Sequence, residues 1–175
     1  MKNYLLLLLM MFPPGLLISQ TTTYAAFQLT NLDGERVSSA DLLQNAKPTV
    51  IIFWKSGSAN CCDNLENMQT AWLEMLKEKN VRMLAICEDF NGDWSHVKPF
   101  VYGKNWEFEV YLDVNGDCRR AMQVTTLPFT IVFDENQQMV CSYAGYCKGN
   151  EDILCEKILH LLNFDNADML SINNK

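Results

Sequence analysis

The sequence predicts an α/β domain with a central mixed sheet flanked by helices. Residues 49–54 and 81–87 form two continuous apolar runs, as expected of parallel strands that are buried on both faces. Apolar residues at helical spacing lie between them, which predicts a strand–helix–strand unit and a parallel core. Residues 129–133 and 139–143 are further strands on either side of a polar segment, and they predict a closing antiparallel hairpin.

An added β-hairpin and a short helical turn precede this core. Residues 27–30 alternate between apolar and polar side chains, Asp33 and Gly34 supply a turn, and Val37 lies in the return strand. Residues 38–43 then have the pattern of a capped helical turn. The expected order of elements is therefore β-hairpin, β-α-β-α-β-α, β-hairpin and α.

The other elements are predicted from the spacing of their apolar residues. The helix that follows Cys61 has apolar side chains at helical spacing, namely Leu65, Met68, Trp72, Met75 and Leu76. Four further elements are expected along the chain: a weaker helix at 94–102 that Pro99 kinks or starts, a strand at 108–112, a short helix at 117–122 and an amphipathic helix at 153–162.

The composition fits one globular domain and excludes a disordered chain. The chain has 175 residues, of which 49% are hydrophobic, and no internal repeat divides it. The domain is expected over 26–162, with a polar tail at 163–175. A net charge of −7 excludes a nucleic-acid partner, because no basic patch is present to replace counterions. His96 and His160 are far apart and no Cys/His spacing resembles a zinc site, so neither a metal nor a cofactor is expected.

Residues 1–19 have the features of a secretory signal peptide. Lys2 supplies the positive charge, residues 5–12 form an apolar run that Pro13 ends, and Ser19 is a small residue before a plausible cleavage site. The apolar run is too short for a membrane-spanning helix, which needs about 20 residues. The sequence thus predicts an exported protein, periplasmic or otherwise extracytoplasmic, without stable membrane insertion after cleavage.

Export would place the seven cysteines in an oxidising compartment. An odd number leaves at least one of them without an intramolecular partner. Cys141 and Cys147 could pair if their strand bends back, whereas Cys87 lies in an apolar run and is expected to be a buried thiol. The adjacent Cys61 and Cys62 are not expected to bond to each other, because a disulfide between neighbours is strained.

Three segments together resemble the thioredoxin superfamily, in particular its exported TlpA/ResA-like branch within the AhpC/TSA–redoxin group. Residues 27–42 resemble the N-terminal hairpin and first helix of that branch, 50–54 its active-site strand, and 124–134 its cis-proline strand. The resemblance covers roughly residues 26–162. It implies a thioredoxin-like fold and thiol–disulfide exchange with protein thiols or disulfides, in a groove beside Pro128.

The departures from this family fall on its redox motif. The family places Cys-x-x-Cys at the start of the helix after the active-site strand, whereas this chain has Ser-Ala-Asn-Cys over 58–61. Ser58 occupies the position of the attacking cysteine, and Cys61 matches the second, more buried one. Gly57 replaces the usual aromatic residue, and Ile52 stands where thioredoxins bury an acid. Because a serine cannot form a disulfide, we expect the dithiol cycle to be impaired.

Three functions remain open at this point. The first is a relative of the thiol–disulfide oxidoreductases that acts in cell redox homeostasis but is limited to single-cysteine chemistry at Cys61, with Ser58 as its hydroxyl neighbour. The second is a redox-inactive module that binds an extended peptide. The third is a peroxiredoxin-like peroxidase, because Ser58-x-x-Cys61 resembles the Thr-x-x-Cys pattern of that family. The resemblance implies that Pro128, Leu127 and Trp54 border the substrate.

Acidic residues follow two of the predicted strands at the sheet edge that carries the motif. They are Glu88, Asp89 and Asp113. Catalysis by a pair of carboxylates is one interpretation of this grouping. Turn and helix-cap roles are commoner for acids at such positions, and we expect those roles here.

Overall fold

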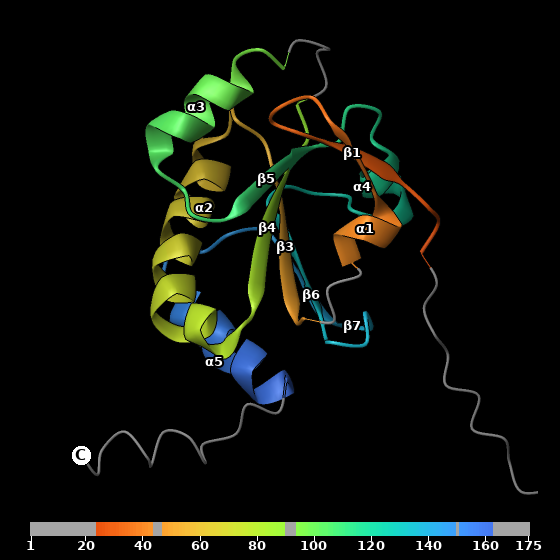
Figure 1. Cartoon of the computed structure of the whole chain (residues 1–175). Helices are drawn as coiled ribbons and strands as arrows, with labels where there is room; N and C mark the ends of the chain where they lie inside the picture. The colour runs from red at the N-terminus through yellow and green to blue at the C-terminus, as the bar shows by residue number, and fades with distance from the viewer. Residues whose placement is uncertain (1–23, 44–46, 90–93, 150, 163–175) are drawn as a thin grey trace, which may run out of the picture.

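Seven strands of the described chain form one mixed sheet in the order β2-β1-β5-β4-β3-β6-β7 (Figure 1). The computed structural model describes residues 24–43, 47–89, 94–149 and 151–162. The strands are β1 (Gln28–Asn31), β2 (Arg36–Ser38), β3 (Thr49–Trp54), β4 (Arg82–Cys87), β5 (Glu109–Leu112), β6 (Phe129–Phe133) and β7 (Met139–Ala144). The α/β class, the central mixed sheet and the N-terminal strand pair are confirmed.

Helices cover both faces of this sheet. Within the described ranges they are α1 (Ser39–Leu43), α2 (Ala59–Ala71), α3 (Val97–Lys104), α4 (Asp117–Ala121) and α5 (Glu151–Leu161). After α2 the chain continues through a π-helical turn at Trp72–Leu76 and a 3-10 turn at Lys77–Lys79. Figure 1 shows α2, α3 and α5 on one side of the sheet, and α1 and α4 on the other.

Strand β3 explains why the core has two layers. All six of its residues are buried. Val50, Ile52 and Trp54 pack into the cluster beneath α2, α3 and α5, whereas Ile51 and Phe53 pack into the cluster beneath α1 and α4. Successive side chains of a strand point to opposite faces, so a strand covered on both sides must be apolar throughout. Burial of each such large side chain stabilises the fold by about 1.5–3 kcal/mol.

The strand register brings three chain segments to one edge of the sheet. Strand β3 pairs in parallel with β4, with Trp54 opposite Cys87. It pairs antiparallel with β6, with Phe53 opposite Phe129. The loop after β3, the loop after β4 and the segment before β6 therefore meet at the same edge. This edge carries the residues that the sequence singled out.

The predicted elements are all found, and one helix begins more than two residues from its expected start. The apolar strands and the closing hairpin lie within one residue of their expected positions. The helix expected at 94–102 begins instead at Val97 and ends at Lys104, so Pro99 does not start it. Pro99 lies in the first helical turn, where its missing N–H removes no bond of the helix.

Two predictions concern segments outside the described residues, namely the signal peptide at 1–19 and the tail at 163–175. They stay predictions, as do the domain limits. Across the described ranges, no helix combines the length and the apolar character that crossing a membrane requires.

Candidate functional site

Ser58 caps helix α2. Its backbone is extended (φ −110°, ψ 112°), and its Oγ accepts a hydrogen bond from the backbone N–H of Cys61 at 3.4 Å. Its carbonyl accepts bonds from the N–H groups of Cys61 and Cys62, both at 3.1 Å. Serine is a favoured N-cap because its oxygen satisfies an N–H that has no partner within the helix. The residue that stands in place of the motif's first sulfur therefore stabilises the helix start.

Cys61 is fully buried in the first turn of α2. It belongs to the core cluster on this face of the sheet, together with Trp54 and Leu65. Its thiol presents no surface to an incoming disulfide or peroxide in this conformation. Direct reaction at Cys61 therefore requires the start of α2 to move.

Cys62 is the half-exposed thiol of the motif region. Its Sγ lies 3.6 Å from the carbonyl oxygen of Ser56, to which it donates. Partial burial raises the pKa of Cys62, and the carboxylates of Glu66 and Asp63 raise it further, while the ammonium of Lys104 opposes them. A raised pKa keeps the thiol protonated at neutral pH, so Cys62 is not an activated nucleophile.

The peptide bond between Leu127 and Pro128 is cis. Pro128 is buried, and its carbonyl accepts a hydrogen bond from the N–H of Gly145 at 2.8 Å. It directly precedes β6, in which Phe129 pairs with Phe53 at the end of β3. The cis-proline and the start of α2 therefore belong to the same edge of the sheet. Leu127 is half-buried and contacts both core clusters.

Trp54 lies behind the motif and does not reach the surface. Its indole stacks against Phe100 with ring centroids 5.9 Å apart, and it meets Trp106 edge-on at 5.2 Å. Aromatic contacts of this geometry hold the end of β3 in place. The structure therefore gives Trp54 a packing position beneath the loop that leads to Ser58.

Three side chains that the sequence analysis did not bring together anchor the loop before α2. The Ser56 N–H donates to Asp89 Oδ1 at 3.1 Å, and Ser56 Oγ donates to Asp89 Oδ2. The Nε2 atom of His96 lies 3.1 Å from Ser56 Oγ and 3.2 Å from Asp89 Oδ2. This is not the arrangement of a nucleophilic triad, because one imidazole nitrogen faces both partners and the serine proton is directed to the carboxylate. The cluster joins the motif loop to the end of β4.

Besides Asp89, two buried carboxyl groups lie at the same edge and differ in their environment. Neither oxygen of the fully buried Glu88 has a hydrogen-bond partner among the described residues. Burial, and then the charge of Asp113, raise the pKa of Glu88 to about 9, so it is protonated at neutral pH. Asp113 accepts bonds from the N–H groups of Cys118 at 3.3 Å and Arg119 at 2.8 Å, which confirms its predicted cap role. Glu88 has no such role. In the sequence, Glu88 could be noticed only as an acidic residue that directly follows an apolar strand.

All seven cysteines are free thiols in the structure. Cys87 is buried, as predicted, and burial raises its pKa well above the usual range. Cys141 and Cys147 are not bonded to each other, so the suggested pairing is not found. Cys147 is exposed and lies in the segment between β7 and α5.

The mixed sheet, the helix that starts after β3 and the cis-proline before β6 define a thioredoxin-like protein. The sequence pattern of the AhpC/TSA family matches residues 21–151. The chain belongs to the AhpC/TSA family. No curated protein sequence matches the chain significantly.

Solved structures agree with this class. An uncharacterized thioredoxin-like protein from Porphyromonas gingivalis is 32% identical, with a TM-score of 0.70 over 83% of this chain and 95% of that one. A putative thiol:disulfide interchange protein DsbE from Chlorobium tepidum is 21% identical, with a TM-score of 0.68 over 79% of this chain and 94% of its own. A secreted disulfide oxidoreductase from Mycobacterium tuberculosis is 19% identical, with a TM-score of 0.61 over 77% of this chain and 95% of that one. At their identities, the last two show the fold alone.

Proposed function

We propose that this chain is an exported thioredoxin-like protein of the thiol–disulfide exchange type, in which the dithiol cycle is lost and the remaining redox chemistry is limited to Cys61. The capping bond from the Cys61 N–H to Ser58 Oγ carries the proposal. It places a hydroxyl where the cycle needs a sulfur, while the rest of the fold is that of the family. Such a protein would act in cell redox homeostasis by holding partner thiols rather than by turning over disulfides.

The single-cysteine reaction has a defined end point. When α2 opens, the Cys61 sulfur attacks a partner disulfide, a new S–S bond forms, and the other partner sulfur leaves as a thiolate. A second motif sulfur would normally break this mixed disulfide from within. Ser58 cannot do so, and release therefore requires an external thiol.

We propose that such a partner binds beside the cis-proline and the start of α2. An extended peptide would lie along Pro128, with Leu127 beside it. Trp54 supports this edge from the core. Suitable partners are proteins that carry accessible thiols or disulfides, or an extended peptide segment.

Export is supported by the signal-like features of residues 1–19. The description of the Mycobacterium tuberculosis structure as a secreted protein agrees with it. We infer a periplasmic or other extracytoplasmic location.

A redox-inactive peptide-binding module is the second candidate, and the complete burial of Cys61 favours it. In that case the cis-proline groove binds an extended segment without any covalent step. No observation favours the peroxidase alternative, since a peroxide has no open route to Cys61 in this conformation.

Insulin reduction with dithiothreitol tests the main proposal. The wild-type protein is expected to give the same rate as dithiothreitol alone. Robust turnover that disappears in Cys61→Ser would refute the loss of the dithiol cycle. A peptide activated as a mixed disulfide then separates the two candidates. An adduct mapped to Cys61 supports single-cysteine chemistry, and reversible binding without an adduct supports the binding module.

A further inference from the structure

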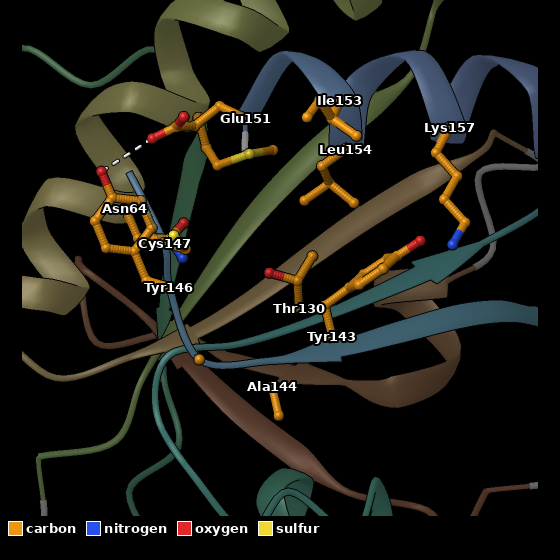
Figure 2. Close-up of a pocket in the computed structure, with 12 residues that line it drawn as sticks. Asn64, Thr130, Tyr143, Ala144, Tyr146, Cys147, Glu151, Ile153, Leu154 and Lys157 are labelled. Carbon is orange, nitrogen blue, oxygen red and sulfur yellow. Dashed lines mark hydrogen bonds between the residues drawn. The ribbon is translucent and has the colours of Figure 1, made fainter. Parts of the chain in front are cut away.

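A cavity of about 460 Å³ lies between α2, α5 and the end of β7 (Figure 2), and neither Ser58 nor Cys61 lines it. Asn64 and Met68 contribute from α2, Tyr143 from β7, and Leu154 from α5. Gly145 also lines the cavity, and its N–H is the group that bonds the carbonyl of the cis-proline. The cavity thus lies next to the proposed peptide groove but is built from other residues.

One end of the cavity combines an exposed thiol with a buried acceptor. Cys147 is exposed and unbonded. Asn64 is only 5% exposed, and its Oδ1 has no hydrogen-bond partner among the residues that the structure describes. Figure 2 shows Asn64, Cys147 and Tyr146 together at this end. A buried acceptor without a partner is unfavourable, so a ligand donor that the Asn64 carboxamide turns to meet would be stabilised there.

The two ends of the cavity carry opposite charges. Beside Cys147, the Glu151 carboxylate accepts bonds from the Tyr146 hydroxyl at 2.9 Å and from the N–H of Gly149 at 2.7 Å. At the other end, the Lys157 ammonium lies 5.2 Å from the centroid of the Tyr143 ring. No carboxylate of the described residues forms an ion pair with this ammonium. A ligand with an ammonium and a carboxylate at its two ends would match this pattern.

Leu154 and Thr130 lie between the two ends (Figure 2), and Met68 also lines the cavity. We propose that the cavity binds a small zwitterionic peptide disulfide and that Cys147 exchanges with it. The ligand carboxylate meets Lys157, the Asn64 carboxamide turns to accept a bond from a ligand amide N–H, and the ligand sulfur lies against Cys147. This site uses neither Cys61 nor Ser58, and it goes beyond the proposed function.

The reaction is a thiol–disulfide exchange, and the bound disulfide is its oxidant. The Cys147 thiol loses its proton, and its sulfur attacks one sulfur of the ligand. The ligand S–S bond breaks as the new bond to Cys147 forms. The other half of the ligand leaves as a thiolate and takes up a proton, so one disulfide is consumed and one is made. The product is a mixed disulfide that fills the cavity and lies beside the cis-proline edge.

Oxidised glutathione is the probe, because it is a small zwitterionic peptide disulfide, and neutral 2-hydroxyethyl disulfide is the reference. The full chain is incubated with each, and the adduct at every cysteine is quantified by peptide mapping. The rate of adduct formation at Cys147 is measured with each probe, in the folded protein and in the urea-unfolded chain. The rate with oxidised glutathione is divided by the rate with 2-hydroxyethyl disulfide, and this ratio is compared between the two states. The intrinsic reactivity of the thiol and of the probes then cancels. We expect the ratio to be about tenfold higher in the folded protein. This factor corresponds to about 1.4 kcal/mol of preferential binding of oxidised glutathione in the cavity. Equal ratios would show an ordinary surface thiol and overturn the proposal.

Two variants assign this selectivity to the cavity. Lys157→Met is expected to lower the ratio about twofold to fivefold, as loss of an exposed ion pair does. Lys148→Met is the matched control, since Lys148 is exposed next to Cys147 but does not line the cavity, and we expect a smaller effect. Asn64→Leu removes the acceptor at similar volume and should lower the ratio about threefold to tenfold. If Asn64→Leu does not fold, Lys157→Met decides. An unchanged ratio in Lys157→Met, or an equal loss in Lys148→Met, contradicts the proposal.

Discussion

The Ser58 hydroxyl accepts a hydrogen bond from the backbone N–H of Cys61, three residues further along the chain, at 3.4 Å. The two positions that would form a disulfide in a redox-active relative are thus joined here by a helix cap. Sulfur is a weaker acceptor than oxygen, so a cysteine at position 58 would cap less well. Serine at this position caps the start of α2 and cannot form a disulfide with Cys61.

The first prediction concerns this cap. We expect Ser58→Ala to lower the free energy of unfolding by about 1 kcal/mol, because the Cys61 N–H loses its acceptor. Urea denaturation followed by circular dichroism measures the change. Ser58→Asp is the matched variant, since aspartate is also a favoured N-cap, and it should retain most of the stability. Equal stability of the alanine variant and the wild type would show that the contact does not stabilise the helix.

The second prediction is a gain of function. Ser58→Cys would place a sulfur at the N-cap, one turn from Cys61, and thereby rebuild a Cys-x-x-Cys pair on the family's scaffold. We expect this variant to accelerate insulin reduction by dithiothreitol above the wild-type level, with somewhat lower stability because the cap is weaker. The double variant Ser58→Cys/Cys61→Ser is the control and should lose the gain. A single variant that stays inactive would mean that more than the missing sulfur prevents the cycle.

The sheet and its helices could be predicted because their signals are local. The continuous apolar run at Thr49–Trp54 has only one stable environment, a central strand covered on both faces. The helix after the motif was also visible from the spacing of its apolar residues, whereas the cap at Ser58 was not predicted. The segment around Pro128 could be assigned through its resemblance to a family strand, and the cis bond agrees with that assignment.

The site itself depends on contacts that a sequence pattern does not contain. Ser56 contacts Asp89, 33 residues further along the chain, and His96, 40 residues further along. No spacing pattern in the sequence predicts that these residues lie together. The burial of Cys61 depends on how closely α2 packs on the sheet. Asn64 belongs to an ordinary helical pattern, and nothing in that pattern indicates that its Oδ1 is buried without a partner or that the residue lines a cavity.

The third prediction tests the loop anchor formed by Ser56, Asp89 and His96. Asp89→Ala is expected to destabilise the protein by about 1–3 kcal/mol, because it leaves the Ser56 N–H and hydroxyl without their acceptor. His96→Ala should cost less than about 1 kcal/mol, since its side chain is 53% exposed. Urea denaturation gives both values, and hydrogen exchange at the Ser56 amide reports the local effect. A larger loss in His96→Ala than in Asp89→Ala would contradict this order.

The fourth prediction concerns the order in which the thiols react. A short pulse of iodoacetamide should label the exposed Cys147 first and the half-exposed Cys62 next, whereas the buried Cys61 should be protected until the helix start opens. Peptide mapping after each pulse length measures the three rates. Cys147→Ser is the control and should leave the labelling of the other two unchanged. Labelling of Cys61 as fast as Cys62 would show that the start of α2 opens readily.

The last prediction follows from the buried carboxyl of Glu88. Its pKa is raised from 4.5 to about 9 in the folded protein, so between these values the folded state holds a proton that the unfolded state has lost. Stability must therefore fall as the pH rises through this window, by up to about 1.4 kcal/mol per pH unit. Below this window Glu88 is protonated in both the folded and the unfolded state, so it contributes no pH dependence of stability.

Glu88→Gln keeps the shape of the side chain and stays neutral, so it should remove this part of the pH dependence. We expect the variant and the wild type to be similar near about pH 5 and the variant to be the more stable near about pH 8. Urea denaturation at several pH values measures the difference. Glu135→Gln, in the exposed turn after β6, is the control and should follow the wild type throughout. Parallel curves for Glu88→Gln and the wild type would mean that Glu88 ionises as readily in the folded protein as in the unfolded chain, and would contradict this prediction.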